Sequence, residues 1–139
     1  GGLFDVAHGA GLAAIWGSWA RYVYKDCLHR FYRFSVNVMK MTALEGLPEE
    51  FAIGKATPSN LSDCDRKRAE EASLKGIEAM EKFFRAIHMP VTMKELGIEP
   101  TEEQIAEMAR KCSVASGGKK GSAKVLVEAD MKKIYEMAR

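Results

Sequence analysis

Three histidines, His8, His29 and His88, are the side chains in this sequence best suited to metal or acid–base chemistry. His8 lies at the expected start of a helix, and its neighbours in residues 6–11 are too small to obstruct an approaching ligand. A helix N-terminus favours the uncharged imidazole that a metal ion requires. The same pattern fits a histidine that hydrogen-bonds locally, and one ligand is not a metal site, so both interpretations stay open. His29 and His88 lie at expected mid-helix and helix-end positions and are interpreted as structural.

The remaining reactive groups favour no catalytic centre. Cys27, Cys64 and Cys112 lie far apart and lack a C-x-x-C spacing, so the sequence predicts neither a disulfide framework nor a zinc ribbon. The glycine-rich segment 117–122 does not match the phosphate-binding loop pattern and follows no expected strand. We find no local arrangement of a nucleophile with a base. The residues taken alone therefore predict no catalytic and no cofactor-binding residue.

Length and charge narrow the class of protein. The chain has 139 residues, with 21 Lys and Arg against 19 Asp and Glu, for a net charge of +2. This length fits one domain, and this charge does not indicate binding to nucleic acid. The uncharged stretch 9–20 is shorter than the roughly 20 apolar residues that cross a membrane, and no basic residue precedes it as in a signal peptide. We expect a cytoplasmic protein that binds neither nucleic acid nor membrane.

The elements that must position His8 are predicted to be helices, because apolar residues recur at spacings of three and four and no segment alternates with period two. The fold class is therefore all-α. Asp5 is expected to cap the first helix, and the loop 42–61 is expected to hold one helical turn with Pro48 at its first position. The helices are expected at residues 7–24, 26–41, 62–87, 92–96, 101–112 and 128–137. Those at 92–96 and 101–112 are each expected to begin with a capping box, formed by Thr92 with Glu95 and by Thr101 with Gln104.

Most of the aromatic residues lie within residues 1–41, so the first two helices are expected to form the core. On the first helix, the face predicted to be buried consists of Leu12, Ile15, Trp16, Trp19 and Val23. On the long helix 62–87, the solvated face is expected to carry pairs of opposite charge four residues apart, at Glu71/Lys75, Glu78/Lys82 and Glu81/Arg85.

The wording of residues 1–13, Gly-Gly-Leu-Phe-Asp-Val-Ala-His-Gly-Ala-Gly-Leu-Ala, resembles the histidine motif of the iron-containing (group III) alcohol dehydrogenases. Residues 30–35 are similar to the next helix of that family, and residues 89–98 resemble its P-x-(T)-x-x-E-L-G-I segment. The ending at residues 130–135 also fits, whereas residues 42–61 match least. The resemblance favours the butanol dehydrogenase and aldehyde reductase branch over the related glycerol dehydrogenase and dehydroquinate synthase branch.

The resemblance implies that residues 1–139 are the C-terminal all-helical, metal-binding half of a two-domain, dehydroquinate synthase-like fold, without the N-terminal nucleotide-binding domain. It implies an oxidoreductase that transfers a hydride between NAD(P)H and a small aldehyde or primary alcohol. The family's divalent metal, Fe²⁺ or sometimes Zn²⁺, is held by one Asp and three His, and His8 matches the last of these. The other ligands would precede residue 1, so this chain alone is expected to bind no cofactor and to be inactive.

A different hypothesis is a non-catalytic helical module that binds a protein partner. Under the dehydrogenase hypothesis, we expect a homo-oligomeric enzyme and an apolar patch at Leu3, Phe4, Val6 and Leu12 on this chain, larger than a monomer normally exposes.

We therefore predict that the 139-residue chain self-associates, because an apolar patch of this kind gains free energy when a second copy covers it. Sedimentation analysis over a concentration series measures this directly. A strictly monomeric chain at high concentration would contradict the prediction.

Overall fold

The computed structural model describes residues 2–55 and 60–139, and its regular elements are all helical, which confirms the all-α prediction. Across the described residues, the β-structure is limited to one isolated bridge between Lys120 and Leu126. No helix in this part of the chain is both long and apolar enough to cross a membrane. The helices are α1 (His8–Val23), the 3-10 helix η1 (Tyr24–Cys27), α2 (Leu28–Arg33), the π-helical η2 (Phe34–Val38), α3 (Glu49–Ala52), α4 (Asp63–Ala86), α5 (Glu102–Ala115) and α6 (Glu128–Ala138).

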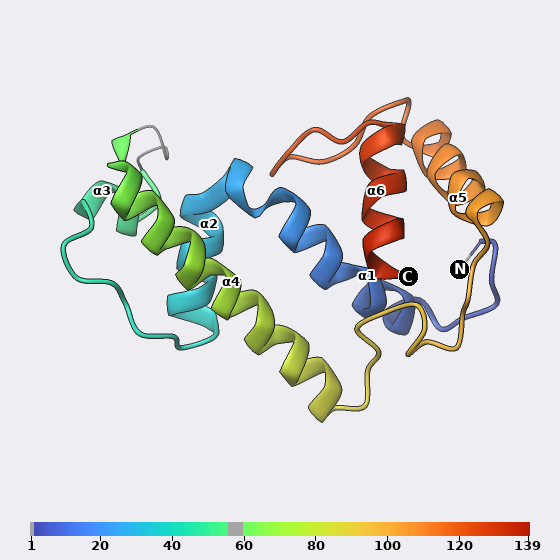
Figure 1. The fold of residues 1–139 in the computed structure, drawn as a ribbon, viewed down its shortest axis with the longest axis horizontal. Coiled ribbons are helices and arrows are strands. Elements are labelled where there is room, and N and C mark those ends of the chain that lie inside the picture. Colours follow the sequence, from blue (N-terminus) through green and yellow to red (C-terminus); the bar gives the residue numbers. More distant parts are fainter. Residues whose placement is uncertain (1, 56–59) are drawn as a thin grey trace.

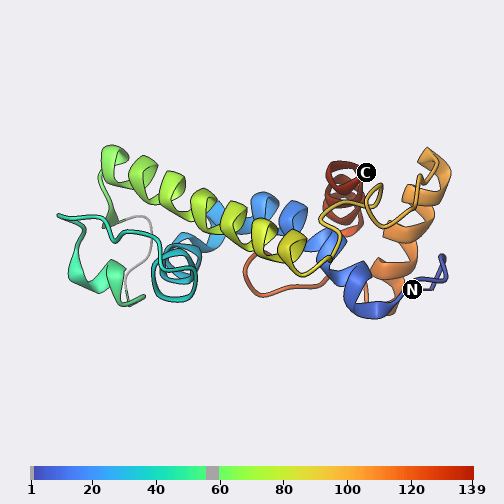
Figure 2. The ribbon, with the colours of Figure 1, turned by 90° about the horizontal axis from the view of Figure 1, so that it is seen from below.

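The helices form an elongated molecule with two ends (Figure 1). At one end, α2 and η2 pack on the long helix α4, with α3 beside them. At the other end, α5 packs on α6, and α6 packs on α1 (Figure 2). Helix α1 contacts both α4 and α6, so it connects the two ends.

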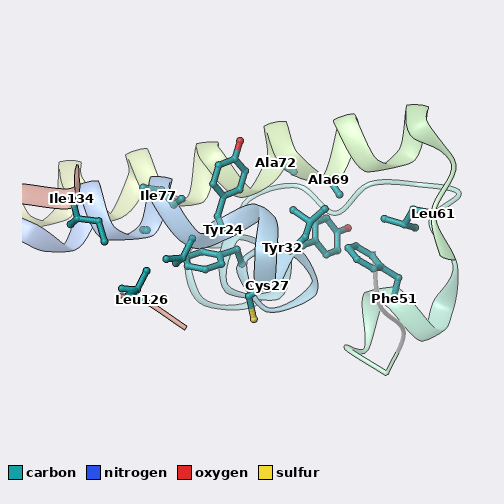
Figure 3. Close-up of a cluster of buried hydrophobic side chains, with 14 of the residues drawn as sticks. Tyr24, Cys27, Tyr32, Phe51, Leu61, Ala69, Ala72, Ile77, Leu126 and Ile134 are labelled. Atoms are coloured by element: carbon teal, nitrogen blue, oxygen red, sulfur yellow. The ribbon is translucent and has the colours of Figure 1, made fainter. Parts of the chain in front are cut away.

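The core follows this elongated shape as a row of buried side chains. Figure 3 shows Leu126 and Ile134 at one end of the row and Phe51 and Leu61 at the other. Tyr32 lies near Phe51, with the two ring centres 5.6 Å apart. The predicted loop 42–61 therefore contributes to the core, because α3 places Phe51 in it without any exposed surface.

The buried face of α1 differs from the predicted one. Val23 is buried as predicted, but Ile15, Trp16 and Trp19 are only partly buried and Leu12 is exposed. Apart from Val23, the buried positions of α1 are small residues, Ala13, Ala14, Gly17, Ser18 and Ala20. Ile15, Trp16 and Trp19 pack against the edge of the core, and the Trp16 ring centre lies 5.8 Å from that of Phe84 on α4. Small side chains let helix backbones approach closely. The larger residues lie on the other side of α1, where they line a cavity.

The second predicted helix, residues 26–41, is divided into η1, α2 and η2 and ends at Val38. Its closest contact is with α4, where a Cβ atom built on Gly76 would lie 2.5 Å from the Cβ atom of Ser35. Ser35 is fully buried and its hydroxyl donates a hydrogen bond of 2.6 Å to the carbonyl oxygen of Ala72. The π-helical turn η2 coincides with this contact, which periodicity alone does not indicate.

Two of the predicted helix starts are confirmed. The Ser62 hydroxyl accepts a hydrogen bond of 3.1 Å from the Asp65 amide at the start of α4. At α5, the Thr101 hydroxyl accepts from the Gln104 amide and the Gln104 side chain accepts from the Thr101 amide, which is the predicted capping box. These local bonds satisfy amides that would otherwise lack an acceptor.

Three local predictions are wrong. Ala7, and not Asp5, occupies the N-cap position of α1, and no side chain caps this helix. Pro48 likewise lies one position before α3. Residues 92–96 form turns in place of the predicted helix. The Thr92 hydroxyl accepts a hydrogen bond of 3.1 Å from the Glu95 amide, but the Glu95 carboxylate accepts from the Val91 amide, and Gly97 ends the turns with a φ of +85°.

The charged pairs also differ from the predicted pattern. Glu81 forms an ion pair of 2.5 Å with Arg21, and Arg85 forms one of 3.1 Å with Glu95, so the predicted Glu81/Arg85 pair does not form. Within the described residues, the Glu71/Lys75 and Glu78/Lys82 pairs are not in ion-pair contact either. The Arg21–Glu81 pair connects α1 to α4, whereas the predicted Glu81/Arg85 pair would have lain within α4 alone.

Replacing Gly76 with Ala tests the contact between η2 and α4. Although Ala favours a helix by about 1 kcal/mol over Gly, the new methyl group would overlap Ser35, so we expect the free energy of unfolding to fall by about 1–3 kcal/mol. Urea unfolding followed by circular dichroism measures it. Gly11→Ala is the matched control, because its Cβ atom would lie 3.6 Å from the nearest side-chain atom, and this variant should not be destabilised. Equal stability of the two variants would contradict the packing described.

A pH dependence is expected from Asp130 at the start of α6. The Tyr22 hydroxyl donates a hydrogen bond of 2.5 Å to one oxygen of Asp130, and the Val127 amide donates to the other, and these bonds lower the pKa of Asp130 below its ordinary value. A lowered carboxyl pKa adds stability above the pKa of the unfolded chain, and this stability is lost as pH falls through the folded value.

We predict that Tyr22→Phe raises the pKa of Asp130 towards its ordinary value, as measured by NMR titration of the carboxyl carbon. Because the pair is only half-buried, the variant should lose no more than about 1 kcal/mol of unfolding free energy near neutral pH, and less in strong acid. Tyr24→Phe is the control and should leave this pKa unchanged. A Tyr22→Phe variant whose Asp130 titrates as in the parent chain would contradict the role of this bond.

Candidate functional site

His8 is the first residue of α1 and is exposed. It lines a cavity of about 540 Å³, here called the N-terminal cavity. The other lining side chains come from the segment before α1, from α1 itself, from the turns before α5, and from α5 and α6. They are largely apolar and include Phe4, Val6, Leu12, Ile15, Met93, Leu96, Met108, Cys112 and Tyr135. The structure thus sets one imidazole at the edge of an apolar space.

This arrangement offers one metal ligand. Among residues 2–55 and 60–139, no group of three or more His, Cys, Asp or Glu side chains is placed to hold a metal ion. Asp5, three residues before His8, is exposed and does not complete such a group. His8 is therefore available as a ligand only within a site completed by groups from elsewhere, and its assignment as a metal ligand stays a prediction.

His29 and His88 do not line the N-terminal cavity with His8. His29 is half-buried on α2 and its Nδ1 atom has no hydrogen-bond partner among the described residues. Burial, with the nearby charges of Arg30 and Arg33, lowers the pKa of His29. His88 is exposed just beyond α4, in the left-handed backbone region with a φ of +61°. The interpretation of both histidines as structural stays a prediction.

Tyr135 and Cys112 form a half-buried polar pair that the sequence did not indicate. Burial raises the pKa of Tyr135 to about 12, and the neighbouring Cys112 thiol contributes through its charge and a hydrogen bond. Tyr135 therefore remains protonated under ordinary conditions. The pairing of Cys112 with Tyr135 depends on how α5 packs on α6, which spacing along the chain does not reveal.

A second cavity, of about 690 Å³, lies on the other side of this pair and is here called the aromatic cavity. Its walls include the side chains of Trp16 and Trp19 from α1 and Phe31 and Phe34 from α2 and η2. Ring centres of Trp16 and Phe34 lie 5.7 Å apart, and those of Trp19 and Phe31 lie 5.9 Å apart. Leu12, Ile15, Cys112 and Tyr135 line both cavities and form their shared wall. Sequence periodicity indicated these aromatic residues only as core.

The four residues expected to form an apolar patch near the N-terminus differ in their exposure. Leu3, Phe4 and Val6 are half-buried, whereas Leu12 leaves 60% of its surface exposed. The segment before α1 lies over the N-terminal cavity and so covers part of its own apolar surface. Leu12 is the member of the expected patch that stays open to solvent.

Comparison with known proteins gives one relevant likeness. The chain is 25% identical over 134 residues to NADH-dependent butanol dehydrogenase A of Clostridium acetobutylicum. The match covers 96% of this chain but 28% of the butanol dehydrogenase, so the chain spans less than a third of the length of that curated relative. No family model matches the chain. No solved structure gives a significant match.

Proposed function

We propose that this chain is the helical part of an NAD(P)H-dependent alcohol dehydrogenase or aldehyde reductase of the iron-containing family. The observation that carries the proposal is the likeness to a butanol dehydrogenase along 96% of the chain, which includes the segment around His8. The all-α structure is compatible with the helical half of such an enzyme. A whole enzyme of this kind would also need a nucleotide-binding domain, and we expect it to be cytoplasmic and homo-oligomeric.

In this proposal, His8 supplies one of the ligands of a divalent metal, Fe²⁺ or Zn²⁺. Its exposure at the start of α1 suits this role, and Gly9 and Gly11 leave the approach to its ring open. When bound, the metal would supply Lewis-acid polarisation of the carbonyl oxygen of the substrate. The chain provides a single ligand, so the remaining ligands would come from the rest of the enzyme.

The apolar residues of the N-terminal cavity would hold the alkyl part of a small aldehyde or alcohol near His8. Phe4, Val6 and Ile15 bring no charge into this space. Their proposed contribution is to exclude water from the place where a hydride is transferred, since a dry site strengthens electrostatic interactions and prevents side reactions. Tyr135, which stays protonated beside Cys112, also lines this cavity.

The first measurement is the coding sequence upstream of residue 1. We expect it to encode a strand-rich half with a glycine-rich loop, one Asp and two His for the same metal. A start codon directly before residue 1 would contradict the proposal. The alternative, a helical module that binds a protein partner, would then be favoured by the exposure of Leu12.

Histidine variants test the assignment in the protein expressed from the complete gene. We predict that His8→Ala lowers aldehyde-dependent NAD(P)H oxidation by more than about a hundredfold and lowers the bound metal, because losing a group that merely orients a ligand already costs about 10- to 100-fold. His88→Ala is the matched control, since His88 is equally exposed but lies away from the N-terminal cavity. Unchanged metal content and activity in the His8→Ala protein would exclude His8 as a ligand.

A further inference from the structure

The aromatic cavity is larger than a small alcohol or aldehyde requires. Its volume of about 690 Å³ lies in the middle of the range of about 300–1,000 Å³ that is usual for cavities holding drug-sized ligands. Apolar side chains make up most of its walls, notably Trp16, Trp19, Phe31 and Ile134. A ligand for this space must therefore present a substantial apolar body.

The charged side chains at the cavity all have the same sign. Arg30, Lys120 and Lys124 line it, and no Asp or Glu does. Lys124 is held by Asp26 at 3.3 Å, but Arg30 and Lys120 form no ion pair with any residue that the structure describes. Both of these unpaired side chains are exposed, so they stand where the cavity meets solvent. An anionic group at this rim would gain two cationic partners.

We propose that the aromatic cavity binds an anionic single-chain amphiphile, namely a fatty carboxylate, with its alkyl chain against Trp16 and Trp19 and its carboxylate between Arg30 and Lys120. This inference uses neither His8 nor a metal. It therefore stands or falls independently of the proposed dehydrogenase function.

The chain carries its own probe for this site, because its two tryptophans both line the cavity. Decanoate is titrated into the 139-residue chain below its aggregation concentration while tryptophan emission is recorded. We expect a saturable, one-site change. Affinity should rise by up to about fourfold for each methylene added from hexanoate to decanoate. Decanol should bind more weakly, and decyltrimethylammonium, whose charge opposes the rim, more weakly still.

Two double variants distinguish a specific effect of Arg30 and Lys120 on decanoate binding from an effect of the total charge of the protein. Arg30→Gln with Lys120→Gln should weaken decanoate binding by about three- to tenfold and leave decanol binding unchanged. Lys94→Gln with Lys133→Gln removes the same charge from exposed positions that do not line the cavity, and it should leave both unchanged. Circular dichroism of each variant checks that the helices are retained.

Three results would overturn the proposal. The first is a tryptophan signal that does not saturate, or that is equal for all three head groups, which indicates simple adsorption to apolar surface. The second is equal weakening in both double variants. The third is a decanoate response that follows dissociation of a dimer in parallel sedimentation runs, since a second copy of the chain would then be the occupant of this cavity.

Discussion

The close packing of α1 against its neighbours through alanine, glycine and serine is the constraint on which most of this structure depends. With Ala13, Ala14 and Gly17 facing the adjacent helices, α1 can contact α4 and α6 together. Leu12, Trp16 and Trp19 consequently lie on the side of α1 opposite the small residues, where they line the aromatic cavity. The distribution of small and large side chains on α1 therefore sets both the connection between the two ends of the molecule and part of the walls of the two cavities.

The secondary structure was largely predictable because its determinants are local. Ser62 and Thr101 start their helices through bonds that span three residues, and such bonds are visible as sequence patterns. The errors occur where a distant contact overrides the local preference. Ser35 is fitted against Gly76, 41 positions along the chain, and Glu81 reaches Arg21 in place of Arg85. Neither partner could be identified from spacing within one helix.

The candidate site was predictable to a smaller extent. The residues around His8 singled it out as a candidate ligand, which stays a prediction, and the structure adds that His8 is exposed and lines an apolar cavity. Hydrophobic periodicity gave α1 a buried face but did not distinguish residues that fill a core from residues that surround an empty space. The large residues of α1 lie on one side of the helix and the small ones on the other, and the buried positions, apart from Val23, are the small ones. The Cys112–Tyr135 pair was hidden for the same reason, since two helices create it.

The row-like core described in Figure 3 has a consequence for how the protein opens. A compact core melts as one unit, whereas a core drawn out along a line permits sub-global unfolding, in which one end loses its hydrogen-exchange protection while the other keeps it. Helix α5 packs mainly on α6, and α6 is joined to α1 by Tyr22 and Asp130. The α5–α6 end can thus form a separate foldon from the α2–α4 end. Transient unfolding of the α5–α6 end would expose both cavities while the α2–α4 end stays folded.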